Sequence, residues 1–395
     1  MEVVRCLSGG RRTIQEIVEQ AAGIYPNDVL DSLRRLKMEQ SVLKTEDSDG
    51  AAVAAQASQR ILIPHPLDFD WRFANVSLGL IARLCIERTS PRDTLAFLGV
   101  PSVFRIQAKL SSRVLALIDR NAHFFTASSG VDLYTSSIPK GPLPELHCSL
   151  VIADPPWYPS ETIAFLWVAA QLCSIGGTIL LSLPPIGTRP GIEMERNLLL
   201  DLLPDLGLEL DRLDASALKY ETPPFEANSL QIAGLSAVNS DWRHGDLAIF
   251  RRSGGPVKLP RPSVEFEPPN EWDEWIISGV RIRVKKKMNC TFGSHELISI
   301  VKDNILHTVS RREPIRAAAD IWTSGNRIFA CENTYPITIV LDALRDNVVF
   351  SASAAAQCLG RSLLYEEDVA LSSLAHEIKK LVEKERVENR GHGYY

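Results

Sequence analysis

The sequence lacks any apolar run long enough to cross a membrane, and its first residues lack the apolar segment of a secretory signal. We therefore expect no membrane span and a cytoplasmic location. Cysteine is present without a pattern, because the seven cysteines are scattered, with no Cys-x-x-Cys pair and no histidine at ligand spacing. This argues against a metal cluster or a disulfide framework, and we expect no metal site.

Excess positive charge is also missing. The chain has 43 lysines and arginines against 48 aspartates and glutamates, a net charge of −5. An acidic balance argues against a protein that coats nucleic acid through its overall charge, although it leaves room for a local basic surface. A chain of 395 residues, 45% of them hydrophobic, is long enough to form more than one domain with a core of its own.

One short segment carries most of the functional information. Residues 148–158 predict a buried strand that runs directly into Asp154-Pro155-Pro156-Trp157. In open α/β sheets, ligands bind beyond the carboxyl ends of the strands. The prolines fix the backbone, so the Asp154 carboxylate and the Pro155 carbonyl converge on one amino group while Trp157 stacks on a flat ring. The alternative is an ordinary strand-to-loop turn.

Strands and helices alternate between residues 93 and 251. The pattern predicts strands at 94–100, 113–119, 131–135, 148–153, 178–183 and 247–250, helices at 102–111 and 160–173, and a turn at Gly176-Gly177. Such alternation predicts an α/β fold with a parallel, doubly wound sheet.

Composition divides the chain into three parts. Residues 1–60 hold two amphipathic helices, a candidate wing strand at 41–45 and a polar linker, which is the pattern of a winged-helix module. Such a module either contacts DNA or serves only for packing and dimerisation. Residues 61–254 form the α/β core, and proline-rich sequence then begins an α+β accessory or recognition domain at 255–395.

Three features of the C-terminal part suggest partners. Five of the seven residues at 281–287 are basic, which either steers a phosphate backbone or protects a sheet edge. The polar and aromatic segment at 322–327 is a candidate ligand or partner site. The charged amphipathic helix at 366–387 favours docking to a protein partner or to a second copy of the chain.

The core and its motif resemble S-adenosylmethionine-dependent amino methyltransferases of the Asp-Pro-Pro-aromatic type, which modify adenine N6 and related exocyclic nitrogens. The resemblance covers residues 93–251 and implies a Rossmann-like core. It places Leu98 and Gly99 at the cofactor loop, which has fewer glycines than is usual in that family. It implies that Asp119 holds the ribose hydroxyls and that Ser136 stands where an acid often contacts the cofactor adenine.

The same resemblance assigns catalysis to residues 154–157. Tyr158, next to this motif, and Phe225 and Glu226 are candidate substrate contacts. Phe225 and Glu226 belong to a second proline-ordered loop at 221–226, for which an ordered connection is the alternative. Because no recognition domain separates the cofactor loop from Asp154, a nucleic-acid partner would be bound by the winged helix or by residues 281–287.

The winged helix and core together also resemble the branched-chain polyamine synthases. That family implies decarboxylated S-adenosylmethionine as cofactor and transfer of an aminopropyl group to spermidine. Against it, a polycationic acceptor requires several carboxylates, and Trp157 suits a flat ring better. The sequence therefore predicts methyl transfer from S-adenosylmethionine to an exocyclic amino group, above all adenine N6 of nucleic acid. Aminopropyl transfer, or a non-catalytic scaffold with the same fold, is the alternative.

Overall fold

The computed structural model describes residues 13–36, 63–264 and 271–391, with short gaps at 22, 69, 111–112, 123–124, 126–129, 139, 237, 239–240, 288–294 and 346–349. The chain forms two compact units that are interleaved in sequence. The first comprises the described residues of Met1–Asp47, Trp71–Thr222 and Ala237–Phe266, and the second those of Ser48–Asp70, Pro223–Ser236 and Glu267–Tyr395. The boundaries that composition places at 60 and 254 stay a prediction. None of the described helices is both long and apolar enough to span a bilayer.

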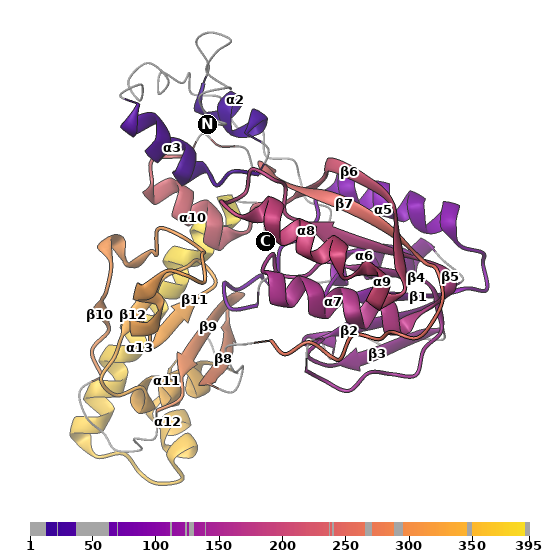
Figure 1. The fold of residues 1–395 in the computed structure, drawn as a ribbon. Coiled ribbons are helices and arrows are strands. Elements are labelled where there is room, and N and C mark those ends of the chain that lie inside the picture. The colour runs from indigo at the N-terminus through magenta and orange to yellow at the C-terminus, as the bar shows by residue number, and fades with distance from the viewer. Residues whose placement is uncertain are drawn as a thin grey trace. The chain divides into compact units, whose positions relative to one another are not determined.

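The first unit is built on a seven-stranded sheet in the order β3-β2-β1-β4-β5-β7-β6 (Figure 1). Its strands are β1 Thr94–Leu98, β2 Val114–Asp119, β3 Val131–Thr135, β4 Cys148–Ala153, β5 Cys173–Leu183, β6 Leu208–Tyr220 and β7 Arg243–Arg252. Strands β1 to β5 pair in parallel, and β7 is antiparallel to β5 and β6. This confirms the α/β, Rossmann-like core predicted from the alternation of strands and helices. The sequence did not predict β6.

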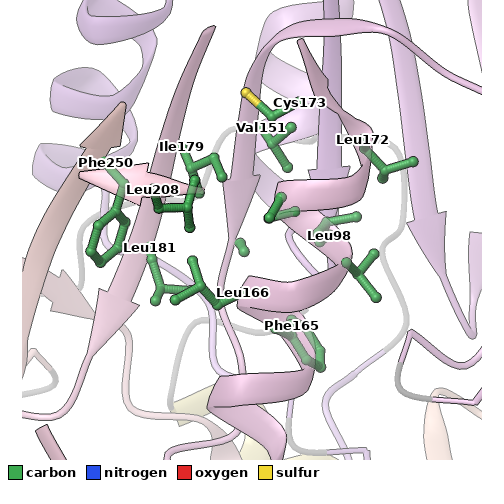
Figure 2. Close-up of a cluster of buried hydrophobic side chains, with 14 of the residues drawn as sticks. Leu98, Val151, Phe165, Leu166, Leu172, Cys173, Ile179, Leu181, Leu208 and Phe250 are labelled. Atoms are coloured by element: carbon green, nitrogen blue, oxygen red, sulfur yellow. The ribbon is translucent and has the colours of Figure 1, made fainter. Parts of the chain in front are cut away.

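Helices cover both faces of this sheet. They are α5 Asn75–Arg88, α6 Pro101–Leu110, α7 Pro159–Leu172, α8 Ile192–Asp201 and α9 Leu203–Leu206. Alternate side chains of a strand point to opposite faces, so Leu98 and Val151 enter the core under α7 while Phe97 and Ile152 enter the core under α5 and α6. Figure 2 shows the α7 core, where Leu166 lies among the side chains of the sheet. Each such side chain, when fully buried, stabilises the fold by about 1.5–3 kcal/mol.

The predicted turn at Gly176-Gly177 is wrong. Strand β5 begins at Cys173, directly after α7, and includes both glycines. Gly176 has φ +85°, and the pairing of β4 with β5 shifts register between Cys148 and Leu150. A glycine in the left-handed region lets the strand absorb this irregularity without ending.

The first unit also contains the two N-terminal helices, α2 Ile14–Gln20 and α3 Pro26–Arg35. A capping box begins α2, because the Thr13 hydroxyl accepts the Glu16 N–H at 3.2 Å and the Glu16 carboxylate accepts the Thr13 N–H at 2.8 Å. The candidate wing strand at 41–45 lies outside the described residues. The winged-helix assignment therefore stays a prediction.

The second unit combines a five-stranded antiparallel sheet with helices. The sheet order is β10-β12-β11-β9-β8. The strands are β8 Trp272–Ile277, β9 Val280–Lys285, β10 Ile298–Ser299, β11 Ile321–Thr323 and β12 Ile328–Ala330. The α-helices are α10 Pro224–Ile232, α11 Tyr335–Arg345, α12 Ala352–Leu359 and α13 Tyr365–Gly391. Two short 3-10 helices are η3 Lys302–Asn304 and η4 Pro314–Ala318. Helix α13 buries Leu374 and Ile378 in the core of its own unit. One apolar face of α13 thus packs within its own unit, and docking through this helix stays a prediction.

Four of the five basic residues at 281–287 form ion pairs within the second unit. Arg281 is 2.5 Å from Asp68 and 2.7 Å from Glu274, and Arg283 pairs with the same two acids. Two lysines are paired as well: Lys286 with Asp273 and Lys287 with Asp320. Strand β9 lies inside its sheet, so edge protection is wrong. Arginines that pair with Asp68 and Glu274 give phosphate steering no support.

The polar segment at 322–327 is a buried turn between β11 and β12. Asn326 adopts φ +64°, and its side-chain oxygen accepts the Trp322 indole N–H at 2.9 Å. Both residues are buried. The polarity of this segment therefore satisfies hydrogen bonds inside the unit, and the expectation of an accessible ligand or partner site there is wrong.

Candidate active site

Parallel pairing brings the predicted cofactor loop and the acidic motif together. Leu98, the last residue of β1, pairs with Ile118 in β2 and with Ala153 in β4. The Gly99 N–H donates to the Ile118 carbonyl at 3.1 Å, and the Asp154 N–H donates to the Leu98 carbonyl at 3.3 Å. Gly99 and Asp154 therefore lie side by side at the carboxyl edge of the sheet, where open α/β folds bind ligands.

Asp119 and Ser136 extend this row along the same edge. The Ser136 N–H donates to the Asp119 carbonyl at 3.1 Å, and both residues are half-buried. The Asn121 N–H donates to Asp119 Oδ1 at 2.7 Å, which orients the carboxylate. The Ser136 hydroxyl donates to the Pro142 carbonyl at 3.4 Å. These two residues thus present a carboxylate and a hydroxyl along the same sheet edge as Gly99.

Gly99 has a structural reason to be glycine. Its φ of +65° is unfavourable for other residues, and a Cβ there would lie 3.2 Å from Phe165 Cε1 of α7. Leu98 is fully buried in the α7 core. Only the backbone of Leu98 and Gly99 can therefore contribute to a ligand site, although the sequence assigned both residues to the cofactor.

Asp154 is fixed by a compact hydrogen-bond network. The Ser182 hydroxyl donates to Asp154 Oδ1 at 2.5 Å, and the Tyr220 hydroxyl donates to the same oxygen at 2.8 Å. The two hydroxyl oxygens are 2.7 Å apart, and the Trp157 indole N–H donates to Ser182 Oγ at 3.1 Å. The network joins the ends of β4, β5 and β6 at one carboxylate.

The environment of Tyr220 makes it a donor to Asp154. Burial and the negative charge of Asp154 hold the pKa of the Tyr220 hydroxyl well above 10, so it keeps its proton. Tyr220 and Ser182 are both buried. A network that ends in buried hydroxyl groups suits anchoring of the carboxylate better than transfer of protons to solvent.

A hollow of about 350 Å³, including its open mouth, lies beside the aromatic half of the motif. Its lining residues are Trp157, Tyr158, Pro159, Thr162, Ile163, Leu183, Pro184, Arg189, Ile192, Glu195, Arg196 and Leu199. Trp157 links Asp154 to the hollow. Its ring lines the hollow, and its indole N–H is hydrogen-bonded to Ser182, which in turn is hydrogen-bonded to Asp154. Mostly apolar and aromatic walls beside a fixed acid are suited to a flat ring with one polar substituent.

The charged groups at this hollow are paired with one another. Arg189 forms an ion pair with Glu195, and its guanidinium carbon lies 5.8 Å from the centre of the Tyr158 ring. Arg196 lies 2.8 Å from Asp246, and both side chains are almost fully buried. Glu195, which lines the hollow, and Asp246, which pairs with the lining residue Arg196, are therefore already matched by arginines.

Arg243, the first residue of β7, is enclosed by three indole rings. Its guanidinium carbon is 3.8 Å from the ring centre of Trp71, 4.8 Å from that of Trp242 and 5.7 Å from that of Trp157. Arg243 also pairs with Tyr220 in the register of β6 and β7. Cation–π contacts of this kind hold the tryptophans in place.

Sequence reasoning missed Ser182, Tyr220 and Arg243. One signal was present, since Ser182 is the polar residue within the buried run 179–183 of β5. Phe225 and Glu226 lie in α10 of the second unit and are buried. Their assignment as substrate contacts stays a prediction.

No family model and no curated protein sequence matches this chain. Among solved structures, it is similar to a branched-chain polyamine synthase mutein from Thermus thermophilus in complex with N4-aminopropylspermidine and 5'-methylthioadenosine, with 14% identity, 66% of this chain and 91% of that chain covered, and a TM-score of 0.49. It is also similar to a putative methyltransferase of Haloferax volcanii in complex with the Trm112 activator, with 14% identity, 44% and 89% coverage and a TM-score of 0.31.

A third similar structure is geranyl diphosphate C-methyltransferase from Streptomyces coelicolor A3(2), determined with Mg2+, geranyl diphosphate and S-adenosyl-L-homocysteine. The two chains are 10% identical, the match covers 44% of this chain and 79% of that chain, and the TM-score is 0.29. At these scores the similarities add nothing to the strand order and pairing described above, which establish the fold on their own.

Proposed function

We propose that this chain is an S-adenosylmethionine-dependent methyltransferase that acts on an exocyclic amino group of a flat heteroaromatic acceptor, with adenine N6 as the leading target. The observation that carries the proposal is the anchored acid. Asp154 directly follows the central strand β4, is held by Ser182 and Tyr220, and is followed by Trp157, which lines a mostly apolar hollow.

The carboxyl edge of β1 and β2 fits a nucleoside donor. Asp119 is an oriented, half-buried acid at the end of β2, where related nucleotide folds bind ribose hydroxyls, and Ser136 lies next to it. The Gly99 backbone lies at the same edge, hydrogen-bonded to the end of β2. When bound, S-adenosylmethionine would supply an electrophilic methyl group. Asp119, Ser136 and the Gly99 backbone would hold it beside Asp154.

On the acceptor side, Asp154 and the Pro155 carbonyl each accept an N–H of the amine. Two hydroxyls donate to Asp154 Oδ1, and an ionised carboxylate offers about four acceptor sites in all. Trp157 stacks on the acceptor ring, which is worth roughly 1–3 kcal/mol. Acceptors that hold both N–H bonds orient the nitrogen lone pair, so the protein contributes positioning more than proton abstraction.

The charges at the hollow favour methyl transfer over aminopropyl transfer. An aminopropyl acceptor is a polycation, and its site requires several carboxylates that are not already neutralised. Here Glu195 and Asp246 are paired with arginines, and Arg243 adds a positive charge beside Trp157. A neutral flat acceptor meets no such opposition.

Mass spectrometry of nucleosides tests the proposal. The protein is incubated with methyl-labelled S-adenosylmethionine and, separately, with adenosine and single-stranded oligonucleotides, because a base in a duplex would first have to be flipped out. We expect labelled N6-methyladenosine from the wild type and at least a hundredfold less from Asp154→Ala, about 2.7 kcal/mol of lost transition-state stabilisation. Label that survives the substitution would remove Asp154 from the mechanism.

A further inference from the structure

The turn between α2 and α3 packs directly on the segment that follows β5. Gly23 is buried in this turn and has φ +85°. A Cβ placed on Gly23 would lie 2.8 Å from Pro185 Cγ and 3.1 Å from Thr188 Oγ1. A proline ring cannot move aside as a flexible side chain does, so only glycine fits at this contact.

The segment contacted by Gly23 forms part of the wall of the hollow. Pro184 and Arg189, on either side of the contact, both line it. The Thr188 N–H donates to the Pro185 carbonyl at 3.0 Å, which closes a tight turn. The Arg196 guanidinium donates to the Pro184 carbonyl. A shift of Gly23 would therefore be passed through a short, stiff segment to the hollow.

The N-terminal helices also reach the tryptophan cluster. The ring of Tyr25, the N-cap residue of α3, meets the ring of Trp242 edge-on at 5.7 Å between centres. Trp242 is almost fully buried, and Arg243 lies over it and beside Trp157. The two helices thus make two contacts with the core. Gly23 contacts the segment after β5, and Tyr25 contacts the Trp242–Arg243 pair, which lies beside Trp157.

The exposed side of α3 shows no phosphate-binding surface. Asp28 and Asp31 are exposed alongside Arg34 and Arg35, and Arg34 is 3.4 Å from Asp31. Mixed, partly paired charges give a weak field for a polyanion. The specific contacts of these two helices are therefore those with the segment beside the hollow, and their exposed side offers no comparable site.

We infer that the module formed by α2 and α3 is a positioning element of the acceptor pocket. Gly23 fixes the segment at 184–189, Tyr25 fixes the Trp242–Arg243 pair, and together they set which flat acceptor the hollow admits. The consequence for acceptor selectivity rests on the proposed transfer function, whereas the mechanical coupling does not.

The test compares Gly23→Ala with Gly176→Ala. Both glycines have φ +85°, but a Cβ on Gly176 meets nothing within 4 Å, so the control carries the same backbone strain without the collision. Hydrogen exchange at residues 184–191 should speed up about tenfold in Gly23→Ala only. The KM for adenosine should rise about tenfold, with kcat and the affinity for S-adenosylmethionine unchanged.

A second pair of variants covers the case in which Gly23→Ala does not fold. Tyr25→Leu removes the ring contact without backbone strain and should raise the acceptor KM in the same way. Adding Pro185→Ala to Gly23→Ala relieves the closest contact and should restore part of the exchange protection.

Equal exchange at 184–191 in both glycine variants would overturn the coupling. Faster exchange with an unchanged acceptor KM in an active enzyme, or a loss confined to oligonucleotide binding, would overturn the positioning role. A wild type that transfers no methyl group would refute the proposed function, while the exchange data would still decide the coupling.

Discussion

Tyr220 matters because its hydroxyl keeps its proton next to a carboxylate. Replacing it by phenylalanine removes the Tyr220 donor to Asp154 Oδ1 and leaves the Ser182 donor in place. We expect Tyr220→Phe to lower kcat about tenfold, because a hydrogen bond to a charged group contributes about 1.5–3 kcal/mol. Steady-state methyl transfer measures this, with Tyr365→Phe, at an exposed tyrosine of the second unit, as the control.

If the Tyr220 hydroxyl only stabilised the fold, kcat would stay unchanged while the unfolding free energy fell. A combined Ser182→Ala and Tyr220→Phe variant separates the two roles. It should lose more than the sum of the single variants, because either hydroxyl alone still orients the carboxylate.

Tyr220 also gives a pH dependence of known sign. Its pKa is raised in the folded state, so above pH 10 the unfolded chain ionises this tyrosine while the folded chain does not. The unfolded state then binds fewer protons, and stability falls as pH rises, by up to about 1.4 kcal/mol per pH unit. Chemical denaturation measures the free energy of unfolding of the wild type and of Tyr220→Phe. The difference between the two should fall above pH 10 and stay constant below it. A flat difference up to pH 11 would contradict the assignment.

The residues of the motif could be predicted from sequence, but their anchors could not. Asp154 through Trp157 are contiguous and follow an apolar strand, so their position at the sheet edge follows from local pattern. Ser182 and Tyr220 lie 28 and 66 residues beyond Asp154. Only the pairing of β4, β5, β7 and β6 brings both hydroxyls to Asp154, and no local sequence pattern encodes that pairing.

At the scale of elements, the apolar strands β1, β2, β4 and β5 were predicted because both of their faces are buried. Strand β6 was missed because it is an edge strand with many exposed, charged residues, which reads as loop. The Gly176-Gly177 turn was a false signal, since glycine also serves an irregularity inside a strand.

Strand β9 shows how a charge pattern misleads. Arg281 is 2% exposed with two acid partners, whereas Lys286 pairs with Asp273 at 3.3 Å and is about half exposed. We expect Arg281→Ala to destabilise the protein by about 1–3 kcal/mol, because Asp68 and Glu274 lose the hydrogen bonds of one of the two arginines that pair with them, although Arg283 still pairs with both. Lys286→Ala should cost at most about 1 kcal/mol. Urea denaturation of the two variants measures both effects, and equal costs would contradict the structural role of Arg281.

At the scale of the whole molecule, the net charge of −5 leaves no surplus of basic residues, and buried arginines such as Arg281 and Arg196 pair with the protein's own acids. The Rossmann-like sheet, the anchored Asp154 and the adjoining hollow all belong to the first unit. The fold of that unit could be predicted from the alternation of strands. The interleaving of the two units could not be predicted, because no change of composition marks Pro223–Ser236, the stretch within the core region that belongs to the second unit.

The central claim is that the carboxyl edge of the first unit holds S-adenosylmethionine beside Asp154. Calorimetric titration with S-adenosylmethionine tests it most directly, on the wild type, Asp154→Ala and Asp119→Ala. We predict binding heat from the wild type and from Asp154→Ala, and at least tenfold weaker binding from Asp119→Ala. Absence of heat from the wild type, or tighter binding of decarboxylated S-adenosylmethionine than of the intact molecule, would contradict the account.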